Sequence, residues 1–362
     1  MILVRRAYID WLRGVAVMIM LIAHATDAWT RDDERRSLLW YWRDVMAGFG
    51  APLFLLLAGV AVAYSAAAKL RRGDTDHDAA RQVAIRGWQI FGIAFLFRLQ
   101  LYVTSVFYRW RSLLKVDILN IMGPSIAGAA WIWGRARTTA GKTLALLVPV
   151  AVLPIATPYV RGSAWLAALP DPIEAYVRPA GEYANFTLFP WAAFVFVGAA
   201  IGVVLERAAD SRAEARRVWV VTATGAAVAA LSWAASFQPS PFPNSHFWTT
   251  SPAFFFLRAG IMTAAFGLAW LWSERLWAGR WQPLVLFGQT SLFVYWVHVE
   301  LVYGYLTKPL SHRLSLAAAS AGVVLLTVAM YYLAKSAKAW IARKREARIS
   351  DWRTKALTVM GL

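Results

Sequence analysis

The sequence contains no cysteine and few charged residues. Of 362 residues, 16% are charged and 59% are hydrophobic, whereas about a quarter of the residues in a typical soluble domain are charged. The absence of cysteine excludes thiol nucleophiles, disulfides and thiolate metal sites. Charged residues are scarce because long apolar runs recur from end to end of the chain. No polar block is long enough to fold alone. The composition therefore predicts an integral membrane protein with several spans.

Several catalytic motifs are also missing. The chain has no G-x-x-x-x-G-K-S/T phosphate loop, no H-E-x-x-H zinc motif and no G-x-S-x-G nucleophile turn. Its five histidines are scattered, so we expect no metal site and no permanently bound cofactor.

The apolar runs predict an all-α bundle. A spanning helix needs about 20 mostly apolar residues. Ten segments qualify: 8–29, 46–68, 83–104, 117–134, 141–160, 187–206, 217–236, 252–273, 284–306 and 314–335. Segments 36–45 and 163–178 are candidates for short interfacial helices.

Lysine and arginine predict the orientation of these segments. One alternating set of loops and ends holds 23 of these residues and the other set holds 11. By the positive-inside rule, both termini are expected in the cytoplasm. We divide the chain into a transmembrane domain over 1–335 and a basic cytoplasmic tail over 336–362. The tail and the net charge of +18 indicate contact with anionic lipid rather than with nucleic acid. We expect 8–29 to be retained as the first span, because Asp10 and Trp11 interrupt the pattern of a cleaved signal.

The first span carries polar residues that lipid does not tolerate. At 100° per residue, Asp10, Arg13, His24 and Asp27 fall within an arc of about 100°. Arg13 and His24 are separated by about 16 Å along the helix axis. The spacing thus predicts an Asp10–Arg13 pair near the cytoplasmic mouth and a His24–Asp27 pair toward the outer side, both facing a hydrated interior. A structural ion pair and a hydrogen-bonded core histidine remain the alternatives.

A second polar stripe lies in segment 284–306. Ser291, Tyr295 and His298 share one face of a helix, whereas Glu300 points nearly opposite and must find a partner elsewhere. For His298, simple packing in the core is the alternative to a catalytic role.

Polar residues in the third, fourth and eighth segments complete the set. Asp117 and Asn120 are neighbours at i,i+3. Arg98 either extends to water or pairs with Asp117 across a short connection. Arg258 lies within an apolar helix and requires a partner that the sequence does not identify.

Five stretches resemble the heparan-alpha-glucosaminide N-acetyltransferase-like membrane proteins, which are related to the type-3 acyltransferases. They are YIDWLRGVAVMIMLIAHATDAW (8–29), GAPLFLLLAG (50–59), VDILNIMGP (116–124), FTLFPWAAFVFVGAAIG (186–202) and SLFVYWVHVELVYGY (291–305). The most specific pieces are the D-x-L-R-G start and the S-L-x-V-Y-x-x-H segment. The resemblance covers residues 8 to about 335.

The resemblance implies an enzyme that moves an acetyl or similar group from cytosolic acyl-CoA to an acceptor, often a sugar, across the membrane. His24 would act as general base or carry the acyl group, with Asp27 orienting it. The expected site residues are His24, Asp27 and His298 for catalysis; Asp10, Arg13, Arg98, Asp117 and Asn120 for the acyl donor; and Ser291, Tyr295 and Glu300 on the acceptor side. In the animal lysosomal members the position of His24 is Asn and the catalytic His lies further along. Here no histidine occurs between His24 and His77, which is expected in a cytoplasmic loop, so His24 is the better catalytic candidate. The acceptor does not follow from the resemblance.

Acyl-CoA is therefore the expected co-substrate, an envelope glycan hydroxyl or amine the expected acceptor, and the cell inner membrane the expected location. A homo-oligomer is left open. The rival interpretations are a transporter or channel, in which the same polar line conducts substrate or protons, and a non-catalytic membrane scaffold.

Overall fold

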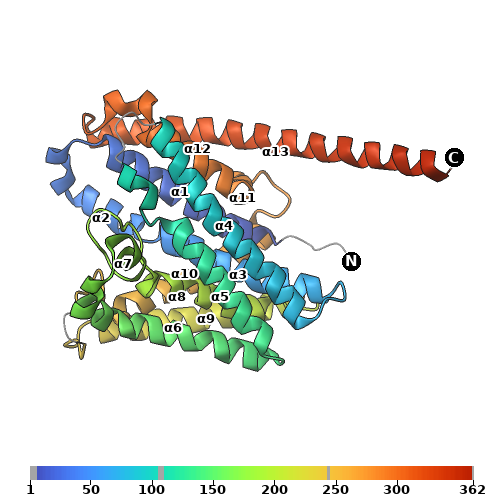
Figure 1. The fold of residues 1–362 in the computed structure, drawn as a ribbon, viewed down its shortest axis with the longest axis horizontal. Coiled ribbons are helices and arrows are strands. Elements are labelled where there is room, and N and C mark those ends of the chain that lie inside the picture. The colour runs from blue at the N-terminus through green and yellow to red at the C-terminus, as the bar shows by residue number, and fades with distance from the viewer. Residues whose placement is uncertain (1–5, 105–109, 243–244, 361–362) are drawn as a thin grey trace.

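The protein is helical throughout the part that a computed structural model describes, residues 6–104, 110–242 and 245–360. In those ranges the only β-structure is two isolated bridges. This confirms the all-α polytopic bundle (Figure 1).

The ten predicted spans all lie on helices. The long helices are α1 (Ala7–Trp29), α3 (Gly50–Leu70), α4 (Asp76–Thr104), α5 (Ile118–Arg135), α6 (Thr139–Gly162), α8 (Leu188–Leu205), α9 (Ser211–Ala235), α10 (Pro252–Leu271) and α13 (Leu316–Met360). The shorter helices are α2 (Leu38–Ala47), α7 (Asp171–Val177), α11 (Pro283–Gln289) and α12 (Ser291–Tyr303). Single turns are η1 (Asp32–Arg36), η2 (Trp110–Leu114), η3 (Ala164–Ala168), η4 (Trp272–Leu276) and η5 (Tyr305–Leu310). The predicted interfacial segments correspond to α2 and to η3 with α7.

The helices that carry the ten predicted spans are not equally apolar. Within the described ranges, seven helices are long and apolar enough to cross a membrane, and eight if the bent pair α11–α12 counts as one span. Helices α4 and α5 do not qualify, because polar residues such as Arg98 and Asn120 lower their hydropathy. Arg98 pairs with Asp117, which lines the candidate site described below.

The predicted span 284–306 is broken. Helices α11 and α12 meet at an angle of 89°. Helix α11 packs along α1, and glycine makes the approach close: a Cβ on Gly14 would lie 1.9 Å from the carbonyl oxygen of Leu284, and one on Gly288 would lie 1.8 Å from that of Asp10. Because only glycine fits at such contacts, α11 is held against the first half of α1 and α12 departs toward its second half.

Helix burial separates an inner from an outer set. Buried residues make up 72% of the apolar window of α8 and 22% of that of α9. Helix α8 therefore lies in the core, where it packs along α3 and α6, whereas α9 packs along α10 at the periphery. Such peripheral apolar surface suits contact with lipid.

Helix α13 continues without a break across the predicted boundary at residue 335. Figure 1 shows it running along one side of the bundle and extending beyond it, to the same end at which α1 begins. Lys335, Lys338, Arg343 and Lys344 are exposed on it. The side chains of the other basic tail residues, Arg345, Arg348, Arg353 and Lys355, lie outside the described part.

Candidate active site

A cavity of about 350 Å³ lies among α1, α3, α5 and α12. Its wall includes Arg13 and His24 from α1, Asp117 at the start of α5, and Ser291 and Tyr295 from α12. The structure thus places the guanidinium and the imidazole in one cavity, as the polar arc of the first span predicts. Most of the remaining wall is apolar, which is typical of a small-molecule pocket with few polar groups.

His24 is hydrogen-bonded to a second histidine. Its Nδ1 lies 2.9 Å from Nε2 of His298, and the two rings stack with centroids 5.1 Å apart. On its other side His298 Nδ1 lies 2.8 Å from the backbone carbonyl oxygen of Val294. His298 is completely buried, so the pair is fixed by packing as well as by hydrogen bonds.

This geometry determines the tautomers of the neutral pair. A carbonyl oxygen only accepts hydrogen bonds, so Nδ1 of His298 carries a proton and donates a hydrogen bond to the carbonyl oxygen of Val294. Nε2 of His298 is then an acceptor, and Nδ1–H of His24 donates to it. The lone pair of His24 is consequently on Nε2, the nitrogen available as a base.

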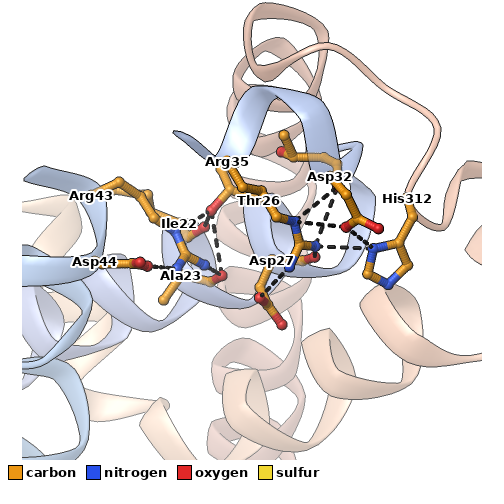
Figure 2. A network of polar contacts seen from close by, with 10 residues as sticks. Ile22, Ala23, Thr26, Asp27, Asp32, Arg35, Arg43, Asp44 and His312 are labelled. Atoms are coloured by element: carbon orange, nitrogen blue, oxygen red, sulfur yellow. Dashed lines mark hydrogen bonds and ion pairs between the residues drawn. The ribbon is translucent and has the colours of Figure 1, made fainter. Parts of the chain in front are cut away.

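The predicted His24–Asp27 pair does not form. Oδ1 of Asp27 lies 3.6 Å from NH1 of Arg35, and no hydrogen bond joins Asp27 to His24 within the described ranges. Arg35 also donates to the backbone carbonyl of Asp27 at 2.5 Å, and to that of Thr30. Figure 2 shows Asp27 turned toward this guanidinium. The carbonyls at the end of α1 attract a cation, and Arg35 draws the carboxylate with it.

Arg43 on α2 is a residue whose role the sequence does not indicate. Its Nε donates to Oγ1 of Thr26 at 2.7 Å, and its NH2 group donates to the carbonyl of Ala23. Figure 2 shows Arg43 beside both partners, and in the sequence Ala23 precedes His24 directly and Thr26 follows it by two residues. The only signal in the sequence is a basic residue in a segment with interfacial character, which does not reveal that it would clamp α1.

Asp10 and Arg13 form the predicted ion pair, with Oδ1 and NH1 3.1 Å apart. Asp10 is buried, and its Oδ2 accepts from Nε2 of Gln289 at 3.3 Å. Gln289 ends α11 immediately before the bend, so the break between α11 and α12 determines this contact. A sequence interpretation that treats 284–306 as one straight helix does not find it.

Arg98 and Asp117 also pair, as one of the two sequence-based alternatives predicts. NH2 of Arg98 lies 2.9 Å from Oδ2 of Asp117, which also accepts from the hydroxyl of Tyr295 at 3.3 Å. Asn120 caps α5 by accepting from the backbone N–H of Asp117, and its amide donates to the Tyr176 hydroxyl. These residues lie at the end of α4 and the start of α5, with Asp117 in the wall that His24 shares. Their assignment to the acyl donor stays a prediction.

The acceptor-side candidates separate. Ser291 and Tyr295 line the cavity. Glu300 lies on another face of α12, where its Oε2 accepts from the Thr104 hydroxyl at 3.3 Å. This agrees with the expectation that Glu300 meets another helix.

Two further cavities lie toward the end of the bundle at which α1 begins. A second cavity of about 490 Å³ shares Ala58 and Ile90 with the first, and its wall includes Lys69 and Arg86. A third, of about 300 Å³, shares Lys69 with the second and includes Arg72. Adjacent cavities thus lie between the one that contains His24 and a group of cations near the end of α3.

Residues 5–231 match the family model described as heparan-alpha-glucosaminide N-acetyltransferase, catalytic. This match covers more than half of the chain, from α1 into α9. The chain belongs to this family. No curated protein matched the sequence. Membership of the heparan-alpha-glucosaminide N-acetyltransferase family implies a membrane acetyltransferase.

The family match includes His24 but ends before α12. Half of the histidine pair, the Ser291–Tyr295 wall and the bent helices therefore belong to a part of the chain beyond the matched residues. In this member of the heparan-alpha-glucosaminide N-acetyltransferase family, the site is built from both parts.

Proposed function

We propose that this protein transfers an acetyl or related acyl group from cytosolic acyl-CoA to an acceptor on the other side of the cell inner membrane, with a glycan hydroxyl or amine as acceptor. Both termini then lie in the cytoplasm, and the exposed lysines and arginines of α13 contact anionic lipid. The single observation that supports this most is the cavity whose wall holds both Arg13 and His24.

The neighbouring cavities suit the donor. Acyl-CoA joins a phosphorylated nucleotide to a long thin arm that ends in the thioester. The second and third cavities are lined by Lys69, Arg72 and Arg86, which supply positive charge for the phosphates. The arm would follow the space past Ala58 and Ile90, with Arg13 along its course, and bring the thioester to His24.

The histidine pair suits the transfer step. The acceptor oxygen or nitrogen attacks the thioester carbonyl, and its proton moves to Nε2 of His24. The carbon–sulfur bond then breaks, and the CoA thiolate takes that proton. His298 accepts from Nδ1–H of His24, so it orients the base and stabilises the imidazolium that forms. Because a thioester is already activated, a positioned base suffices without a metal or a second nucleophile.

The test is consumption of acyl-CoA by the purified full-length protein in detergent. We expect His24→Ala to lower the rate by about 10²- to 10⁴-fold, the usual contribution of a general base. His77→Ala is the matched control, because the His77 side chain is 86% exposed on the first turn of α4. Equal rates for wild type and His24→Ala would refute the proposed role.

A transporter is the second candidate, and the bend between α11 and α12 favours it, since broken helices near a substrate site are common in transporters. The distinguishing result is solute movement into proteoliposomes that proceeds without acyl-CoA consumption.

A further inference from the structure

A separate cavity of about 800 Å³ lies among α2, the end of α9, residues 245–251 and α10. Aromatic side chains form much of its wall: Trp42, Trp233, Phe237, Phe247, Trp248 and Phe254. Four of these, namely Trp42, Trp233, Phe237 and Trp248, are themselves exposed at the surface. The cavity is therefore open to the surroundings of the bundle, at the end opposite to the start of α1.

The charged side chains in this wall are Asp44 and Arg258. Asp44 is paired with Arg43 at 2.5 Å. Arg258 is only 7% exposed, and within the described ranges no carboxylate forms an ion pair with it. Its NH1 donates to the carbonyl of Gly48 at 3.2 Å, its guanidinium lies 4.3 Å from the Phe254 ring, and its Nε has no hydrogen-bond partner among the described residues.

Such an arginine calls for an anion. A buried charge is stable only when it is paired and its donors are satisfied, and ring contacts and one carbonyl do not neutralise a guanidinium. The planar set of N–H donors on a guanidinium matches two oxygens of a phosphate. The aromatic wall suits hydrocarbon rather than water, so a matching ligand carries both a phosphate and a hydrocarbon part.

The position of Arg258 agrees with a lipid headgroup. It lies six residues after the start of α10 at Pro252, or about 9 Å along the axis. The phosphate of a lipid at the membrane surface would thus lie less than two helical turns inside the cavity. The hydrocarbon chains of that lipid would run along the exposed aromatic side chains, which favour the interface between lipid and water.

We propose that this cavity binds a phosphate-bearing lipid, with the phosphate on Arg258 and the hydrocarbon on the aromatic wall. Gly48 belongs to the walls of both this cavity and the one that contains His24, so the headgroup lies beside the catalytic cavity. If the proposed function holds, this position suits an acceptor that is presented on a lipid.

The site is also linked mechanically to His24. Arg258 holds the carbonyl of Gly48, the residue that ends α2. Five residues earlier on α2, Arg43 contacts Thr26 and Ala23 of α1 on either side of His24. A lipid that fixes Arg258 therefore fixes the end of α2 and, through it, the backbone that carries the imidazole.

Binding is measured on the delipidated full chain in a neutral detergent, by tryptophan fluorescence and native mass spectrometry. The ligands are a short-chain phosphatidylglycerol, the matching diacylglycerol and inorganic phosphate. We expect phosphatidylglycerol to bind at least tenfold more tightly than either of the other two. Equal binding of the diacylglycerol would overturn the role of the phosphate, and equal binding of inorganic phosphate would show a soluble-anion site instead of a lipid site.

Two variants locate the site. Arg258→Met should weaken phosphatidylglycerol binding at least tenfold, whereas Arg212→Met, an exposed arginine at the start of α9, should not. Ser236→Trp fills the cavity and keeps Arg258, so it should also weaken binding, and it answers the question if Arg258→Met fails to fold. Unchanged binding in a folded Arg258→Met or Ser236→Trp protein sinks the proposal. Because these assays contain no acyl-CoA, their outcome is independent of the transferase activity.

Discussion

His298 can be substituted so that one of its two hydrogen bonds is kept and the other lost. Its Nε2 lies 2.9 Å from His24 and its Nδ1 lies 2.8 Å from the carbonyl of Val294. The amide of glutamine falls near the position of Nε2, and the amide of asparagine near that of Nδ1. His298→Gln therefore keeps an acceptor for His24, and His298→Asn removes it.

The size of the effect follows from burial. His298 is completely buried, so His298→Asn leaves Nδ1–H of His24 without a partner in a place that water does not readily reach. An unsatisfied buried donor costs about 1–3 kcal/mol, which corresponds to a rate about 5- to 150-fold lower. We expect His298→Asn to fall in this range and His298→Gln to stay within about threefold of wild type.

The assay is steady-state acyl-CoA consumption, with thermal unfolding measured on the same preparations. The loss in His298→Asn should appear in kcat, with KM for acyl-CoA nearly unchanged, because the donor-binding cavities are intact. If asparagine and glutamine give the same rate, or if the loss follows unfolding temperature, His298 does not position His24 and the tautomer argument is refuted.

Three further predictions address other parts of the site. Asp27→Asn should leave acyl-CoA consumption within about twofold of wild type and lower stability by less than about 1 kcal/mol, as expected when a half-exposed ion pair with Arg35 is lost; a drop in kcat of tenfold or more would restore Asp27 as the partner of the base. Gly288→Ala places a Cβ 1.8 Å from the carbonyl of Asp10, so α11 must move; unfolding temperature and kcat should both fall, and an unchanged unfolding temperature would show that the close contact is not required. Lys69→Ala should raise KM for acyl-CoA several-fold while kcat stays near wild type, and a normal KM would remove this cation from the donor site.

Features that depend on local spacing were predictable. The Asp10–Arg13 pair forms because residues three apart on a helix are neighbours. Gly59 illustrates a less local case: a run of small residues predicts a close contact, and a Cβ at this position would lie 1.9 Å from the carbonyl of Val195. The sequence identifies the small residue, but the partner helix becomes known only from the packing.

The segment 284–306 shows what the sequence does not predict. Its composition is apolar along its whole length, and helical periodicity does not distinguish one straight span from two helices at 89°. The bend depends on backbone contacts between α11 and α1, which join residues 270 or more positions apart. Hydropathy contains no information about such contacts.

The sequence by itself determined the class of protein, the helices and the polar arc of the first span, because composition and the 3.6-residue period act within a few neighbouring residues. Only the tertiary structure decided which groups within that arc meet. Asp27 is one turn from His24, yet the carbonyls that end α1 bring Arg35 to Asp27. His298 is 274 residues away, yet the bend before α12 brings it to the imidazole. Hydrogen bonds reach about 3 Å, so the partner of a buried side chain is decided by which helices pack together.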